Sequence, residues 1–142
     1  MKKYLFASLI LLIIGVVLFN FYKYREQSLD ELLDMDNVDK IHIITEYKDS
    51  YEFEISKVDQ EIITKLADFL NQYKVKLTNQ DGWISNYENE RFELHLGYKN
   101  GAYEIYTLER DVVVSNRVYK VVNEPLDYKW IKGLERDINS LR

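Results

Sequence analysis

The stretch "YLFASLILLIIGVVLFNFY", residues 4–22, carries no charged side chain and constrains the fold more than any other segment. As an α-helix that rises 1.5 Å per residue, it would extend about 28 Å, close to the thickness of the hydrocarbon core of a bilayer. Two lysines precede it and a basic segment follows it. We therefore predict an N-terminal transmembrane helix that anchors the chain over residues 1–25.

The end of this stretch distinguishes a retained anchor from a cleaved signal peptide. Cleavage requires small residues immediately before the cut, and residues 20–26, "NFYKYRE", contain none. We predict a retained signal anchor, with cleavage as the alternative. Aromatic residues are enriched at membrane–water interfaces, and those that we expect there are Phe21, Tyr22 and Tyr24.

The charges that flank the apolar stretch predict its orientation. The amino terminus with Lys2 and Lys3 opposes Lys23 and Arg25, a narrow excess that favours a cytoplasmic N-terminus. We therefore expect a single-pass protein of the cell membrane whose C-terminal domain lies outside the cytoplasm.

Charge and cysteine content exclude several classes of function. Residues 1–26 hold four of the 19 Lys and Arg and one of the 24 Asp and Glu, so the remainder carries a net formal charge of −8. Such an acidic domain is a poor match for nucleic acid, which we exclude as a partner. The absence of cysteine excludes disulfides, thiolate metal sites, a catalytic thiol and a lipid-modified N-terminal cysteine.

Residues 26–37, "EQSLDELLDMDN", predict a short acidic helix that links the anchor to the domain. Its leucines have helical spacing, and Ser28 followed by Glu31 resembles a capping box. We interpret the acidic side chains as the solvated face of this helix.

Residues 38–142 alternate strand and helix signals. Residues 38–45 and 51–56 have apolar side chains at alternate positions and predict a hairpin, with Tyr51 and Phe53 on its apolar side. The segment "KVDQEIITKLADFLNQY" predicts a helix capped by Asp59. "KVKLT" after it predicts a short strand.

A last helix is predicted to open at Asn123 or Glu124, with Pro125 in its first turn. Together these signals predict an α+β fold, in which one mainly antiparallel sheet packs against two or three helices. The apolar side chains that we expect these two helices to bury are Ile62, Ile63, Leu66, Phe69, Leu70, Tyr73, Leu126, Trp130, Ile131, Leu134, Ile138 and Leu141.

Residues 91–109, "RFELHLGYKNGAYEIYTLE", predict a β-hairpin. Asn100-Gly101 favours a two-residue type I′ turn, which would pair Leu94 with Thr107 on the core side. The other side would form a contact surface that can bind a basic protein partner, unless a helix covers it. The residues that this register places there are Glu93, His95, Glu104, Tyr106 and Leu108.

The loop "LTNQDGWISNYE" partly matches a calcium-binding EF-hand. Asn79, Asp81 and Glu88 fall at positions 3, 5 and 12 of such a loop, but Leu77 stands where the first ligand belongs. The flanking segments are strands rather than helices. We therefore interpret the loop as a polar turn, with calcium as the weaker alternative.

Catalytic motifs are absent from the sequence. No serine stands in a nucleophile elbow or an S-x-x-K motif, and no glycine-rich phosphate loop is present. With only His42 and His95, a transition-metal site would lack imidazole ligands. We expect no enzymatic activity and no cofactor.

The segments "KVDQEIITKLADFLNQY", "YKNGAYEIYTLE" and "RVYKVVNEPLDYKWIKGLER" give the chain a pattern that resembles small, mostly uncharacterised membrane-anchored extracytoplasmic proteins of low-GC Gram-positive bacteria. The likeness spans Val38 to Leu141, and the lipobox cysteine that many such proteins carry is missing. It implies an accessory or regulatory protein that binds a partner in the cell envelope. The alternatives are a membrane-tethered immunity protein against a secreted toxin and a small extracytoplasmic enzyme.

Overall fold

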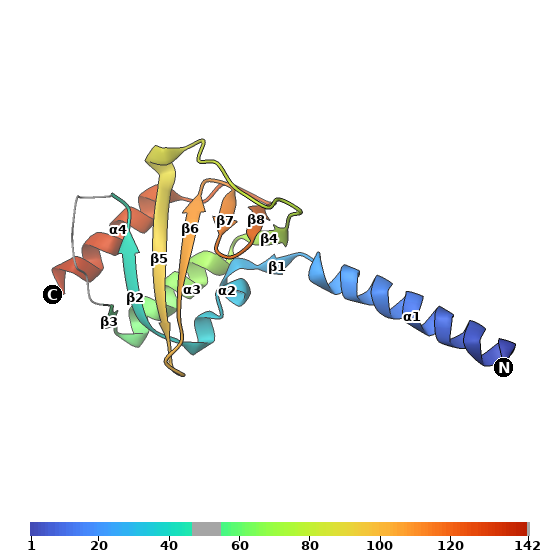
Figure 1. Cartoon of the computed structure of the whole chain (residues 1–142). Helices are drawn as coiled ribbons and strands as arrows, with labels where there is room; N and C mark the ends of the chain where they lie inside the picture. The colour runs from blue at the N-terminus through green and yellow to red at the C-terminus, as the bar shows by residue number, and fades with distance from the viewer. Residues whose placement is uncertain (47–54, 142) are drawn as a thin grey trace.

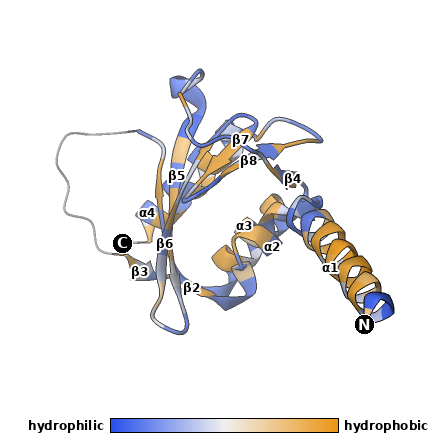
Figure 2. Cartoon of the chain, turned by 45° about the vertical axis from the view of Figure 1, so that its right-hand side comes forward, coloured by the Kyte–Doolittle hydropathy of each residue, from blue (hydrophilic) through white to orange (hydrophobic). Residues whose placement is uncertain are grey.

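The long helix α1 (Lys2–Lys23) projects away from the rest of the chain (Figure 1). The computed structural model describes residues 1–46 and 55–141. None of the residues of α1 is buried, and the helix is long and apolar enough to cross a membrane (orange in Figure 2). Its 22 residues extend about 33 Å at 1.5 Å per residue. The prediction of an apolar N-terminal helix that fits a membrane anchor is confirmed.

The other described residues form an antiparallel eight-stranded sheet with strand order β1-β4-β8-β7-β6-β5-β2-β3. The α+β class is therefore confirmed. The strands are β1 (Gln27–Ser28), β2 (Val38–Ile44), β3 (Ser56–Lys57), β4 (Lys74–Leu77), β5 (Arg91–Tyr98), β6 (Tyr103–Glu109), β7 (Val112–Val114) and β8 (Val118–Val121). The helices after α1 are α2 (Leu29–Leu32), α3 (Gln60–Asn71) and α4 (Tyr128–Ser140), with 3₁₀ turns η1 (Met35–Asn37) and η2 (Glu88–Glu90).

The first predicted hairpin is described only in part. Strands β2 and β3 pair antiparallel, with Ile41 opposite Ser56. Tyr51 and Phe53, which were predicted on the apolar side of its second strand, lie outside the described residues.

The hydrophobic core lies between one face of the sheet and the helices α2, α3 and α4 (Figure 1). All six apolar residues predicted for the helix that corresponds to α3 are buried. Five of them lie in α3, where the 3.6-residue period turns them to one side, and Tyr73 follows the end of the helix. The rings of Phe69 and Trp130 stack with centroids 4.1 Å apart, so α3 and α4 pack against each other as well as against the sheet.

Helix α4 begins later than the sequence signals predicted. Its N-cap is Asp127, whose carboxylate accepts a hydrogen bond from the Trp130 amide at 3.1 Å. Pro125 therefore precedes the helix instead of standing in its first turn. Leu141 follows the last turn and is 69% exposed, so its predicted burial is wrong.

The segment predicted as a linker helix over residues 26–37 belongs to the domain. Its first residues form β1, in which Gln27 pairs with Val75 of β4, and only α2 and η1 follow. Ser28 occupies the N-cap of α2 without a side-chain hydrogen bond, and Asp34 has a positive φ that ends the helical path. Because β1 is part of the sheet, the residues that follow it are held against the core. The buried apolar side chains of this segment are Leu29, Leu33 and Met35.

The hairpin of β5 and β6 differs from its predicted register by one residue. Tyr98 accepts from the Gly101 amide, and the Tyr98 amide donates to Ala102, both at 2.9 Å. This closes a three-residue loop in which Gly101 (φ 87°) is left-handed and Asn100 is not, the geometry of a type I turn with a G1 bulge. Leu94 therefore faces Tyr106 instead of Thr107, and every side chain of β6 changes face.

The left-handed backbone of Gly101 predicts that alanine destabilises the chain more at this position than at Gly82. Gly101→Ala should lower the free energy of unfolding by about 1 kcal/mol, because an L-residue resists a left-handed backbone. Gly82→Ala is the control, since Gly82 has no positive φ and an added Cβ would meet no atom within 4 Å. Denaturant unfolding of the full chain in detergent measures both. Equal losses would contradict the observed turn.

Candidate functional site

The face of the sheet opposite the core is the candidate functional site. Of the helices that the structure describes, none lies over this face, which is turned toward the viewer in Figure 1. We call it the open face. It is formed by side chains of the central strands that the register directs away from the helices, namely His42, Glu93, His95, Tyr103, Ile105 and Thr107.

Two large side chains of β6 on this face reach solvent. Tyr103 is 48% exposed and Ile105 is 43% exposed, and both lie in the part of the β5–β6 hairpin that extends past the pairing with β7. Ile105 pairs directly with His95 on the neighbouring strand. An aromatic and a branched aliphatic residue on a rigid backbone form a contact surface that loses little side-chain entropy on binding.

His95 is buried on the open face and contacts Tyr103. It is only 4% exposed, with Nδ1 2.5 Å from the Tyr103 hydroxyl and Nε2 3.0 Å from Glu93 Oε2. The ring of His42 meets it edge-on at 6.1 Å between centroids. Burial raises the pKa of the Tyr103 phenol, and the Glu93 carboxylate raises it further. The Tyr103 ring is therefore held as a neutral phenol in a fixed orientation.

A buried carboxylate shapes one border of the open face. Glu109, at the end of β6, is 2% exposed and accepts hydrogen bonds from Ser85 Oγ at 2.5 Å, from the Asn86 amide at 2.7 Å and from the Tyr87 amide. Charge-assisted bonds of this kind are about twice as strong as neutral ones. They hold residues 85–87 against the sheet, and Arg110 covers the Tyr87 ring at 4.4 Å.

The predicted contact residues do not share one face. Glu93 and His95 lie on the open face, whereas Glu104, Tyr106 and Leu108 project to the side of the helices. Tyr106 and Leu108 are buried in the core, so their prediction as contact residues is wrong. Burial raises the pKa of Tyr106, and hydrogen bonds to Glu104 and Tyr98 add to this effect. The one-residue change in the turn is the cause, and it brings Tyr103 and Ile105 to the open face.

Glu109 was not among the predicted site residues. On the observed register it continues the alternation of Tyr103, Ile105 and Thr107, so the correct turn would have placed it on the open face. Its three partners lie in a loop without periodicity, and no sequence signal indicated that contact.

The three residues considered as calcium ligands make different contacts in the structure. Asn79 accepts a hydrogen bond from the Tyr24 hydroxyl at 2.7 Å, Asp81 lines a pocket, and Glu88 begins η2. Across residues 1–46 and 55–141, no group of three His, Cys, Asp or Glu side chains is placed to hold a metal ion. Calcium binding by this loop stays the weaker alternative to a polar turn.

The three aromatic residues predicted at the membrane interface surround the end of α1. Phe21 and Tyr22 are exposed, and the Arg25 guanidinium lies 4.7 Å from the centroid of the Tyr22 ring. Tyr24 is half-buried against the domain through its bond to Asn79.

No model of a known protein family matches the chain, and no curated protein or solved structure is significantly similar to it. The resemblance to anchored extracytoplasmic proteins therefore stays a prediction.

The hydrogen bonds of Glu109 to residues 85–87 predict that a substitution of Glu109 lowers the free energy of unfolding. Glu109→Gln should lower the free energy of unfolding by about 1–3 kcal/mol, because a neutral amide oxygen weakens the charge-assisted bonds from the Asn86 and Tyr87 amides and an NH2 group replaces the oxygen that accepts from Ser85 Oγ. Glu90→Gln is the control, since the Glu90–Arg110 pair is exposed and 4.0 Å apart, and such pairs contribute about 0–1 kcal/mol.

Denaturant unfolding measures both variants, and hydrogen exchange reports the amides of Asn86 and Tyr87. Faster exchange in Glu109→Gln alone is expected. Similar exchange and stability in the two variants would contradict the role of Glu109.

Proposed function

We propose that this chain is a single-span membrane protein that displays its domain outside the cytoplasm and binds a protein of the cell envelope through the open face. The observation that carries the proposal is the exposure of Tyr103 and Ile105 on the open face of the β5–β6 hairpin, where both residues are held by pairing with β5. Aromatic and apolar anchors surrounded by polar groups are typical of the energetic centre of a protein interface.

The fixed support of Tyr103 strengthens this argument. Its hydroxyl is held by His95, which is held in turn by Glu93, so binding need not order these side chains. Preorganised groups contribute more of their contact energy to affinity. Tyr103 and Ile105 are therefore the contact residues that we expect to contribute most.

Charge indicates the chemistry of the partner. The chain beyond residue 26 carries a net formal charge of −8. An acidic domain attracts basic proteins and raises their association rate, especially at low salt. A partner with a basic rim around an apolar centre fits the open face, and the role that we infer is accessory or regulatory.

Site-directed cross-linking tests the open face. A benzoylphenylalanine replacing Ile105 in the full-length protein should form a discrete protein adduct in cell membranes, because Ile105 lies at the centre of the proposed interface. The same residue replacing Arg136, which is exposed on α4, is the control and should form none. The identity of the adduct then distinguishes an envelope subunit from a secreted toxin.

Adding Tyr103→Ala to the cross-linking chain should reduce the adduct, since truncation of a central interface residue weakens binding by about 30-fold. Equal adducts from the two positions, or an adduct that Tyr103→Ala does not change, would contradict the proposal.

Reporter fusions test the side of the membrane. An enzyme that is active only outside the cytoplasm, fused after the last residue, should be active, because Lys2 and Lys3 favour a cytoplasmic N-terminus. Deleting α1 should abolish that activity. Activity only of a reporter that requires the cytoplasm would contradict this topology.

A further inference from the structure

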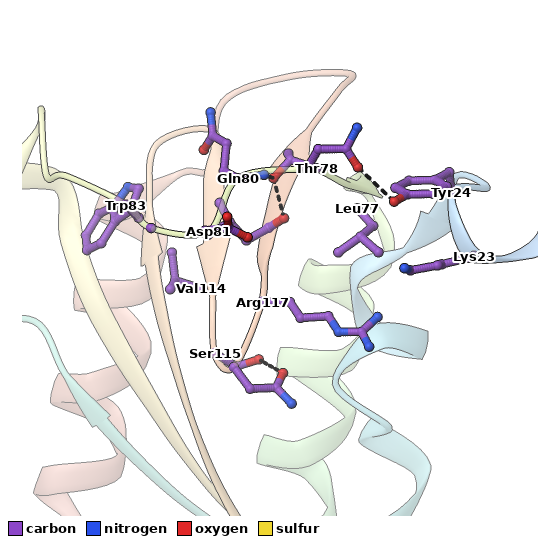
Figure 3. Close-up of a pocket in the computed structure, with 14 residues that line it drawn as sticks. Lys23, Tyr24, Leu77, Thr78, Gln80, Asp81, Trp83, Val114, Ser115 and Arg117 are labelled. Atoms are coloured by element: carbon purple, nitrogen blue, oxygen red, sulfur yellow. Dashed lines mark hydrogen bonds between the residues drawn. The ribbon is translucent and has the colours of Figure 1, made fainter. Parts of the chain in front are cut away.

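A cavity of about 430 Å³ opens where α1 meets the domain (Figure 3). Lys23 and Tyr24 line it from the end of α1, residues 77–83 line a second wall, and residues 114–118 of the turn between β7 and β8 complete it. The Tyr24 hydroxyl bonds to Asn79 at 2.7 Å and joins two of these walls. The cavity is therefore built jointly by the membrane helix and the domain.

The length of α1 places this cavity at the level of the lipid headgroups. A helix of 22 residues extends about 33 Å, slightly more than the roughly 30 Å hydrocarbon core of a bilayer. Lys23 is its last residue, so its ammonium group lies just beyond the hydrocarbon. Tyr24 and Trp83 border the cavity on two sides (Figure 3), and both residue types favour the membrane–water interface.

The charge of the cavity is opposite to that of the domain around it. Lys23 and Arg117 extend toward it from different elements, and of the described residues that line it only Asp81 is acidic (Figure 3). Among the described residues, neither Lys23 nor Arg117 forms an ion pair. Two cations directed into one cavity repel each other, and an anion between them removes this repulsion.

We propose that this cavity binds the phosphate of an anionic bilayer phospholipid whose headgroup carries hydroxyl groups, as phosphatidylglycerol does. The planar guanidinium of Arg117 can donate two parallel hydrogen bonds to the phosphate, and Lys23 supplies a point charge. The Asp81 carboxylate can accept a hydrogen bond from a headgroup hydroxyl. The acyl chains would lie along α1, which ends at the same cavity.

This inference depends on α1 spanning the bilayer and is independent of any protein partner at the open face. Arg117 is exposed in a turn, so its replacement should leave the fold intact. Arg136 is also exposed but lies on α4, outside the cavity, and gives a matched control.

The test uses the full-length protein in detergent micelles, with bound lipids counted by native mass spectrometry during titration. One phosphatidylglycerol should bind more tightly than phosphatidylcholine or an uncharged glycolipid. Arg117→Ala should weaken this binding about tenfold or more, the effect of losing a hydrogen bond to a charged group, while Arg136→Ala should not change it.

Equal affinities in the two variants, or equal binding of the uncharged glycolipid, would overturn the proposal. Glycerol phosphate and inorganic phosphate are added as competitors to distinguish a lipid from a soluble phosphate. If these competitors displace the lipid only at a large molar excess, the result supports a lipid as the ligand of the cavity. Displacement by equimolar soluble phosphate would show that the cavity serves a soluble ligand and overturn the assignment.

Discussion

The three-residue turn between β5 and β6 determines which side chains of the central hairpin face the helices. Because side chains alternate along a strand, one residue more or less in this turn would exchange the two faces of β6. The observed turn gives Tyr106 and Leu108 to the core and leaves Tyr103 and Ile105 on the open face. The packing of α3 and α4 and the composition of the open face therefore depend on one left-handed glycine, Gly101.

A second dependence joins the membrane helix to the sheet. Residues 24–26 are all that separate α1 from β1, and β1 pairs with β4 at the edge of the sheet. The Leu29 amide continues this attachment by donating to the Tyr73 carbonyl at 3.0 Å. A connection of three residues restricts the orientations of the domain relative to α1. If α1 spans a bilayer, as we propose, it is an anchor joined closely to the sheet rather than a flexible tether.

Sequence patterns predicted the elements whose stability is local. Helix α3 carries its apolar residues on one side within a few turns, so periodicity alone identified it. Sequence patterns did not predict the features that depend on contacts between residues distant in the sequence. Strand β1 is only two residues long and forms because it pairs with β4 at Val75. Glu109 accepts its hydrogen bonds from a loop 22 to 24 residues before it. Asn-Gly is compatible with both turn types, and the choice between them depends on how Tyr106 and Leu108 fill the core.

The distribution of charge connects the cavity at the base with the open face above it. Lys23, Arg25 and Arg117 gather around the end of α1, whereas the chain beyond residue 26 is strongly acidic. An anionic membrane surface attracts the first group and repels the second, and both effects decay over about 8 Å at physiological salt. In the topology that we propose, the same membrane would hold the base of the domain and keep the acidic remainder in solvent. A basic partner close to the bilayer would then meet an acidic domain whose open face is directed away from the lipid.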